Sequence, residues 1–66
     1  MDIKVNDKSY TIEAGTTVAA LLPVIGVEPK GIAVAVDGTV VPQPDWNTYV
    51  LTSGASVVII KAFYGG

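Results

Sequence analysis

Few residues in this 66-residue chain could take part in catalysis. The chain contains no cysteine and no histidine, so the usual pairs of a nucleophile and a general base cannot be built. The commonest metal ligand is missing for the same reason. The six carboxylates are scattered, mostly beside expected turns: Asp2, Asp7, Glu13, Glu28, Asp37 and Asp45. We therefore expect that the protein is not an independent enzyme and holds no metal or cofactor itself.

The group with the clearest chemical use is the α-carboxylate that follows Gly65 and Gly66. Because average sequences contain about 7% glycine, a Gly-Gly end arises by chance in roughly 0.5% of chains. Two residues without Cβ atoms can lie extended in a crevice too narrow for other residues. A carboxylate is a poor acyl donor, but ATP on a partner enzyme can activate it as an acyl-adenylate. The pattern predicts that Gly66 reacts and that Gly65 gives it reach; an inert end is the alternative.

Two segments with alternating apolar residues predict β-hairpins. Residues 1–12 alternate on both sides of a polar turn at residues 6–8, which is the period of a half-buried strand. Residues 31–42 alternate in the same way, and Asp37-Gly38 supplies the two positive-φ positions of a type I′ turn. Pro42 cannot donate to a sheet, so the return strand ends there or lies at an edge.

One short helix is predicted over residues 17–26. Thr17 is a suitable N-cap, and the apolar residues share one helical face: Val18, Leu21, Leu22 and Ile25. Gly26 suits the left-handed position that closes a helix. We expect Pro23 to kink or tighten the helix, because its ring clashes with the carbonyl of Ala19.

The remaining segments complete the predicted fold. Residues 42–54 are irregular, with a 3₁₀ turn near residues 45–47 and three residues that hold the loop on the core: Trp46, Tyr49 and Leu51. Residues 55–63 form a nearly continuous apolar run, typical of a central strand with a parallel neighbour. The order β-β-α-β-β-turn-β predicts an α+β fold of the β-grasp (ubiquitin-like) type. We expect a mixed sheet of about five strands covered on one face by one helix, in a single domain of residues 1–66 with a flexible tail over about residues 63–66. A small antiparallel barrel competes with this prediction.

A partner-binding surface is predicted on the last strand. Lys61 should point away from the helix, because burying an unpaired ammonium group is costly. Alternation then sends one set of side chains outward, near Ala33 or Ala35, and the other set (Val58, Ile60, Ala62) into the core. The predicted partner-binding residues are Val57, Ile59, Lys61, Phe63 and Tyr64. Contiguous exposed apolar surface often marks an interface, whereas scattered apolar residues are ordinary surface.

The chain also resembles a known family along its whole length. The segments "EAGTTVAALL" and "AVAVDGTVVP", Trp46 soon after Pro42, and the final "GG" are similar to the sulfur carrier protein family of thiamine biosynthesis, the ThiS family. The resemblance implies that an activating enzyme of the ubiquitin-activating type adenylates Gly66 with ATP. A persulfide-derived sulfur then displaces AMP and leaves a thiocarboxylate, and thiazole synthase accepts that sulfur.

Other functions remain open at this stage. The small subunit of molybdopterin synthase and a ubiquitin-like protein modifier would use the same adenylation, and a plain binding domain would use none. The net charge of −2 and the lack of a basic stripe argue against nucleic acid as a partner. No apolar stretch approaches the roughly 20 residues of a membrane span, and the amino end does not resemble a signal peptide. We therefore expect a cytoplasmic protein that is monomeric on its own.

Overall fold

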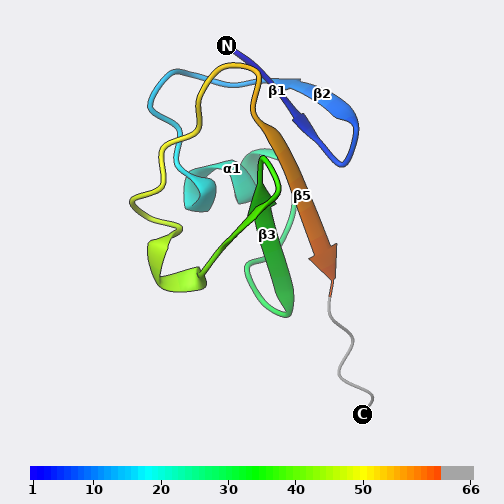
Figure 1. Cartoon of the computed structure of the whole chain (residues 1–66), viewed down its shortest axis with the longest axis vertical. Coiled ribbons are helices and arrows are strands. Elements are labelled where there is room, and N and C mark those ends of the chain that lie inside the picture. Colours follow the sequence, from blue (N-terminus) through cyan, green and yellow to red (C-terminus); the bar gives the residue numbers. More distant parts are fainter. Residues whose placement is uncertain (62–66) are drawn as a thin grey trace.

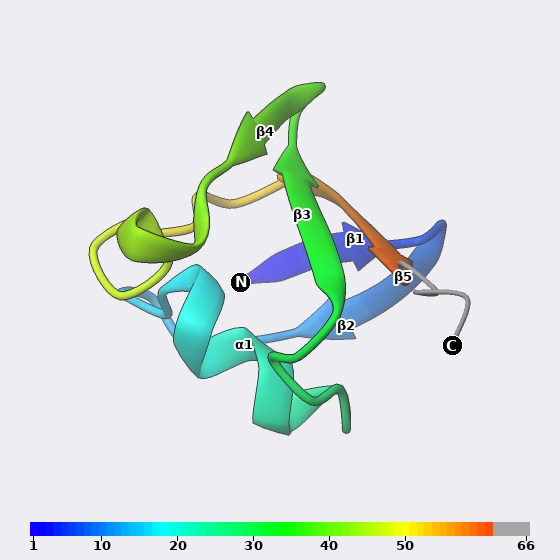
Figure 2. The same cartoon turned by 90° about the horizontal axis from the view of Figure 1, so that it is seen from below.

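In residues 1–61, the part of the chain that the computed structural model describes, five strands form one mixed sheet (Figure 1). Their order across the sheet is β2-β1-β5-β3-β4. Figure 2 shows the single helix of this part, α1, lying against one face. The elements are β1 Asp2–Val5, β2 Lys8–Thr11, α1 Val18–Val24, β3 Ile32–Val36, β4 Thr39–Val41, the 3₁₀ turn η1 Gln43–Asp45 and β5 Ser56–Lys61.

This arrangement confirms the predicted β-grasp fold. Strand β5 pairs with β1 in parallel and with β3 in antiparallel orientation, so the competing antiparallel barrel is wrong. The expectation of a single domain with a tail over residues 63–66 stays a prediction, because residues 62–66 lie outside the described part of the chain.

Both hairpins close through two-residue turns with positive φ. Asp37 (φ 50°) and Gly38 (φ 83°) join β3 to β4, as predicted. Asn6 (φ 48°) and Asp7 (φ 69°) join β1 to β2, so the first turn is one residue shorter than the predicted turn at residues 6–8. Asn and Asp tolerate this left-handed region better than other side chains, and two such residues in succession match the twist of the flanking strands.

The start of α1 is capped from two directions. The Thr17 hydroxyl oxygen accepts from the backbone N–H of Ala20 at 3.2 Å, which confirms the predicted N-cap. The N–H groups of Val18 and Ala19, which a helix cannot satisfy itself, donate to the carbonyls of Tyr49 and Trp46 at 3.0 Å each. The irregular loop before β5 is therefore joined to the helix through its backbone.

The end of α1 shows why so short a helix stops where it does. Pro23 lies in its last turn, and Gly26 follows with φ 73°. The N–H of Val27 donates to the carbonyl of Leu22 at 2.9 Å, and that of Gly26 donates to the carbonyl of Pro23 at 3.2 Å. This pair of bonds is a Schellman motif, and it confirms the closing role predicted for Gly26.

The core lies between α1 and the sheet and consists of apolar side chains. No polar or charged side chain of residues 1–61 is buried. The buried residues are Ile3, Val5, Ile12, Val18, Leu21, Leu22, Val34, Val36, Val41, Trp46, Leu51, Ala55, Val57 and Ile59. Trp46 and Leu51 thus hold the irregular loop, as predicted, whereas Tyr49 is exposed and does not. The 3₁₀ turn at Gln43–Asp45 lies two residues earlier than predicted.

Replacing Trp46 with phenylalanine should destabilise the fold. The buried indole Nε1–H donates to the Val41 carbonyl at 2.8 Å, and phenylalanine leaves that carbonyl without this donor. An unsatisfied buried polar group costs about 1–3 kcal/mol, so we expect the free energy of unfolding to fall by about that amount. Urea denaturation followed by far-UV circular dichroism measures it. Tyr49→Phe, at an exposed ring, is the control, and equal stability of the two variants would contradict the prediction.

Candidate functional site

Strand β5 leads directly to the predicted reactive end of the chain. It lies at the centre of the sheet, with Lys4↔Ser56 and Val5↔Val57 paired to β1 and a longer register from Ile32↔Lys61 to Val36↔Val57 on β3. The prediction of a central strand parallel to the first is therefore confirmed. Four predicted site residues, Phe63, Tyr64, Gly65 and Gly66, lie outside the described residues. The five residues after Lys61 can span at most about 17 Å, which limits how far Gly66 stands from the sheet.

The predicted orientation of β5 is wrong. Val57 and Ile59 are only 1% and 9% exposed and belong to the core. Val58 and Ile60 are 43% and 59% exposed and lie on the outer face of the sheet. Val57 and Ile59 therefore do not form the outward surface that was expected of them as partner-binding residues. Ala62, which was placed in the core, lies outside the described part.

The error comes from the position of Lys61 at the end of the strand. Lys61 lies on the same side as Ile59, at the edge of a cavity of about 380 Å³ that Tyr10 and Ile25 also line. Its side chain is nevertheless exposed, because a long lysine stem can follow apolar surface while the ammonium group stays in water. The cost of burying an ammonium group therefore never arises. Ser56, at the other end of β5, is exposed on the outer face. Had this polar residue been used to orient the strand, it would have predicted the observed orientation.

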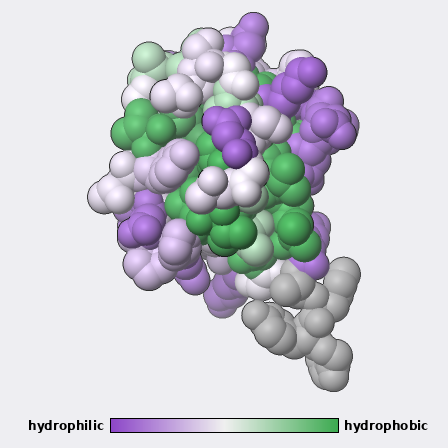
Figure 3. Space-filling view, in the orientation of Figure 1, coloured by the Kyte–Doolittle hydropathy of each residue, from purple (hydrophilic) through white to green (hydrophobic). Residues whose placement is uncertain are grey.

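An apolar patch covers part of the outer face of the sheet. Val58 and Ile60 pair with Ala35 and Ala33 of β3, and Ala35 pairs in turn with the exposed Val40 of β4. We call this set the outer apolar patch: Ala33, Ala35, Val40, Val58 and Ile60. Figure 3 shows apolar side chains gathered on the lower part of this face and hydrophilic ones toward the β1–β2 hairpin. The predicted proximity to Ala33 and Ala35 is confirmed, with different residues of β5.

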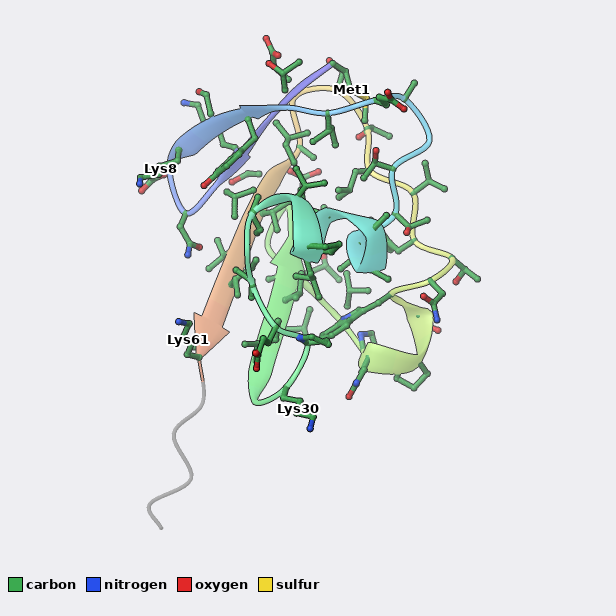
Figure 4. The ribbon with its side chains drawn as sticks, turned by 180° about the vertical axis from the view of Figure 1, so that it is seen from behind. Met1, Lys8, Lys30 and Lys61 are labelled. Carbon is green, nitrogen blue, oxygen red and sulfur yellow. The ribbon has the colours of Figure 1, made fainter. Side chains whose placement is uncertain are left out.

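Charged groups also mark the end of the molecule where β5 stops. Figure 4 shows Lys30 and Lys61 at this end, with Met1 at the opposite end. Both lysines line a shallow cavity of about 310 Å³ together with Gly26 and Ile32. Lys61, a predicted partner-binding residue, is thus accessible at the last described position.

Residues 1–61 lack two kinds of feature that would point to other functions. Among residues 1–61, no group of three or more acidic, histidine or cysteine side chains could hold a metal ion. In the same part of the chain, no helix has the length and apolar character to cross a membrane.

Comparisons with known proteins agree with this reading of the fold. The sulfur carrier protein ThiS of Escherichia coli (strain K12) is 29% identical over 66 residues, which cover all of both chains. The crystal structure of the thiamine biosynthesis protein ThiS from Geobacter metallireducens superposes with a TM-score of 0.84 at 25% identity, covering 100% of this chain and 99% of that one. A solution structure of a thiamine biosynthesis protein from the same organism, 23% identical and with a TM-score of 0.76, covers 100% and 88% and shares the fold. The model of the ThiS family matches residues 3–66, and the chain therefore belongs to the ThiS family.

Proposed function

We propose that the chain is a sulfur carrier of thiamine biosynthesis and that the α-carboxylate of Gly66 carries the sulfur as a thiocarboxylate. One observation carries the proposal: the family match runs through Gly66, and the alignment with the Escherichia coli sulfur carrier spans all of both chains. The position of β5 supports it, because a strand paired on both sides precedes the Gly-Gly end. In this role the protein is a co-substrate of partner enzymes and needs no catalytic side chain.

The proposed cycle needs only the terminal carboxylate of the carrier and none of its side chains. A Gly66 carboxylate oxygen attacks the α-phosphorus of ATP on an activating enzyme of the ubiquitin-activating type, and pyrophosphate leaves. The terminal sulfur of a persulfide attacks the resulting acyl carbon and displaces AMP. A partner thiol then cleaves the sulfur–sulfur bond, which leaves the thiocarboxylate and a disulfide. Thiazole synthase passes the sulfur to its acceptor substrate, and the carboxylate returns with an oxygen atom supplied by that acceptor or by water. Because the cycle draws on ATP, we place the protein in the cytoplasm.

The outer apolar patch is the surface that we assign to the activating enzyme. Two of its residues, Val58 and Ile60, lie on the strand that leads to Gly66, so a partner that docks there holds the carboxylate within a limited reach. Apolar surface of this kind, exposed on a folded domain, favours protein–protein contact. The patch replaces the predicted surface at Val57 and Ile59, whose side chains are buried.

Ile60→Lys should weaken binding of the activating enzyme. The change puts a charge on the outer apolar patch beside Ala33 and Val58, and loss of an interface hot spot costs about 2 kcal/mol or more. We expect the dissociation constant to rise at least about thirtyfold. Calorimetric titration with the activating enzyme measures it. Val24→Lys is the matched control, because Val24 is 61% exposed, close to the 59% of Ile60, and lies on α1. Equal affinities for the two variants would show that the outer apolar patch is not part of the interface.

Intact-mass spectrometry tests the carrier function itself. With activating enzyme, ATP and a persulfide donor, one oxygen of the chain should be replaced by one sulfur. Isopeptide adducts on lysines of other proteins would instead support a protein modifier, and an unchanged mass would overturn the proposal. Complementation of a thiamine-requiring strain, but not of one that lacks molybdopterin synthase activity, should then assign the pathway. The match to the ThiS family favours the thiamine branch.

A further inference from the structure

The side chain of Asn6 adds two hydrogen bonds between β1 and β5 beyond the backbone ladder. The backbone N–H of Asn6 donates to the Val57 carbonyl at 2.9 Å. In a regular parallel ladder its own carbonyl would next accept from Ile59, but the chain turns here, with φ 48° at Asn6. Instead, Asn6 Oδ1 accepts from the Ile59 N–H at 2.9 Å and Asn6 Nδ2 donates to the Ile59 carbonyl at 3.3 Å. One amide thus replaces both backbone groups that β1 no longer supplies.

This contact lies next to the part of the sheet that has the fewest strands. Strand β4 pairs with β3 only from Val34 to Val36, and the β1 pairs with β5 stop at Val57. The end of β5 near Lys61 is therefore joined to β3 alone, through pairs that include Ile32↔Lys61. A two-stranded ribbon is marginally stable in water. Asn6 binds the edge of β5 that faces away from β3, and beyond Val57 this edge has no strand partner among the described residues.

We propose that Asn6 is a positioning residue for sulfur transfer. By holding the backbone of Ile59 it keeps the described end of β5 on the sheet, and so limits the length of chain that the activating enzyme must order to bring Gly66 to ATP. This inference rests on the proposed function. Each additional residue released from β5 would have to be immobilised at each encounter, at a cost in conformational entropy. Loss of the Asn6 contact therefore acts on binding of the carrier and leaves the chemical step unchanged.

The chain contains a matched control for this contact. Asp37 is likewise the first residue of a two-residue hairpin turn, with φ 50°. Its Oδ1 also accepts from a β5 backbone group, the N–H of Ser56, at 2.9 Å. Asp37 thus holds the start of β5, and Asn6 holds the end that leads to Gly66. Glycine at either position keeps the left-handed turn accessible and removes only the side-chain contact.

The experiment compares Asn6→Gly with Asp37→Gly in adenylation by the activating enzyme. For Asn6→Gly we expect KM for the carrier to rise about tenfold, the equivalent of ordering about one more residue, with kcat unchanged. For Asp37→Gly we expect KM to stay as it is. Asn6→Asp keeps the oxygen that accepts from Ile59 and should recover part of the loss. Hydrogen exchange at the amide of Ile60, which Asn6 does not contact and which faces Ala33 of β3, should accelerate in Asn6→Gly alone.

The possible outcomes separate this inference from the proposed function. An equal change in KM for both glycine variants, or none for either, overturns the positioning role, because a general effect on stability would act on both. If the unaltered chain is not adenylated at all, the proposed function fails. Hydrogen exchange then still decides whether Asn6 holds the end of β5, since equal exchange at Ile60 in both variants would overturn that contact's role.

Discussion

Removal of Gly66 should reduce sulfur transfer at least about a hundredfold while the fold stays intact. The truncated chain would end in the carboxylate of Gly65, about 3.5 Å short of the original reach. A misplacement of about 1 Å at a reacting centre can already cost about a hundredfold in rate. The measurement is the fraction of chain that gains sulfur, followed by intact mass with activating enzyme, ATP and persulfide donor.

The control for this truncation is a measurement that the truncated chain keeps its fold. The buried core lies within the described residues 1–61, so the far-UV circular dichroism spectrum and the melting temperature after removal of Gly66 should be those of the full chain. Gly66→Ala keeps the reach and adds one methyl group, and it should retain more activity than the truncation. Sulfur transfer at an undiminished rate by the truncated chain would show that the reactive group is not the carboxylate of Gly66.

Ile59→Asp should unfold the protein, whereas Ile60→Asp should not. Ile59 packs in the core at 9% exposure, and an unpaired charge buried there costs several kcal/mol. Small domains are stable by only about 5 kcal/mol or a little more, so this single change removes most of the stability. Ile60 is 59% exposed on the outer face, where a carboxylate keeps its water. Thermal denaturation followed by circular dichroism compares the two variants.

This pair of neighbouring variants tests the orientation of β5 directly. The opposite result, with Ile59→Asp folded and Ile60→Asp unfolded, would restore the orientation that Lys61 predicted and would remove the outer apolar patch. A folded Ile60→Asp with weakened binding of the activating enzyme would agree with the Ile60→Lys prediction. The two positions therefore separate residues that hold the fold from residues that face a partner.

Short stretches of sequence were enough to predict most of the strands, turns and helix ends. The dipeptide Asp37-Gly38 and the caps Thr17 and Gly26 act through the backbone of their own neighbours. The first turn was predicted one residue too long because Lys8 looks like a turn residue in composition, although it pairs with Val5 in the hairpin. The exposure of Tyr49 was missed because an aromatic residue in a loop does not reveal whether the core has room for it.

The sequence by itself determined the order of the strands and helix, the centrality of the last strand and the Gly-Gly end that points to acyl activation. The elements follow from the spacing of apolar residues and from turn chemistry, which are properties of neighbouring residues. The role of the Gly-Gly end follows from the composition of the chain, which lacks catalytic side chains. Only the tertiary structure decided which face of β5 is buried, because that depends on where α1 stops covering the sheet. Lys61 stands beyond the core and reaches water from the covered side. The contact between Asn6 and Ile59, 53 residues apart in sequence, likewise exists only once β1 and β5 lie side by side.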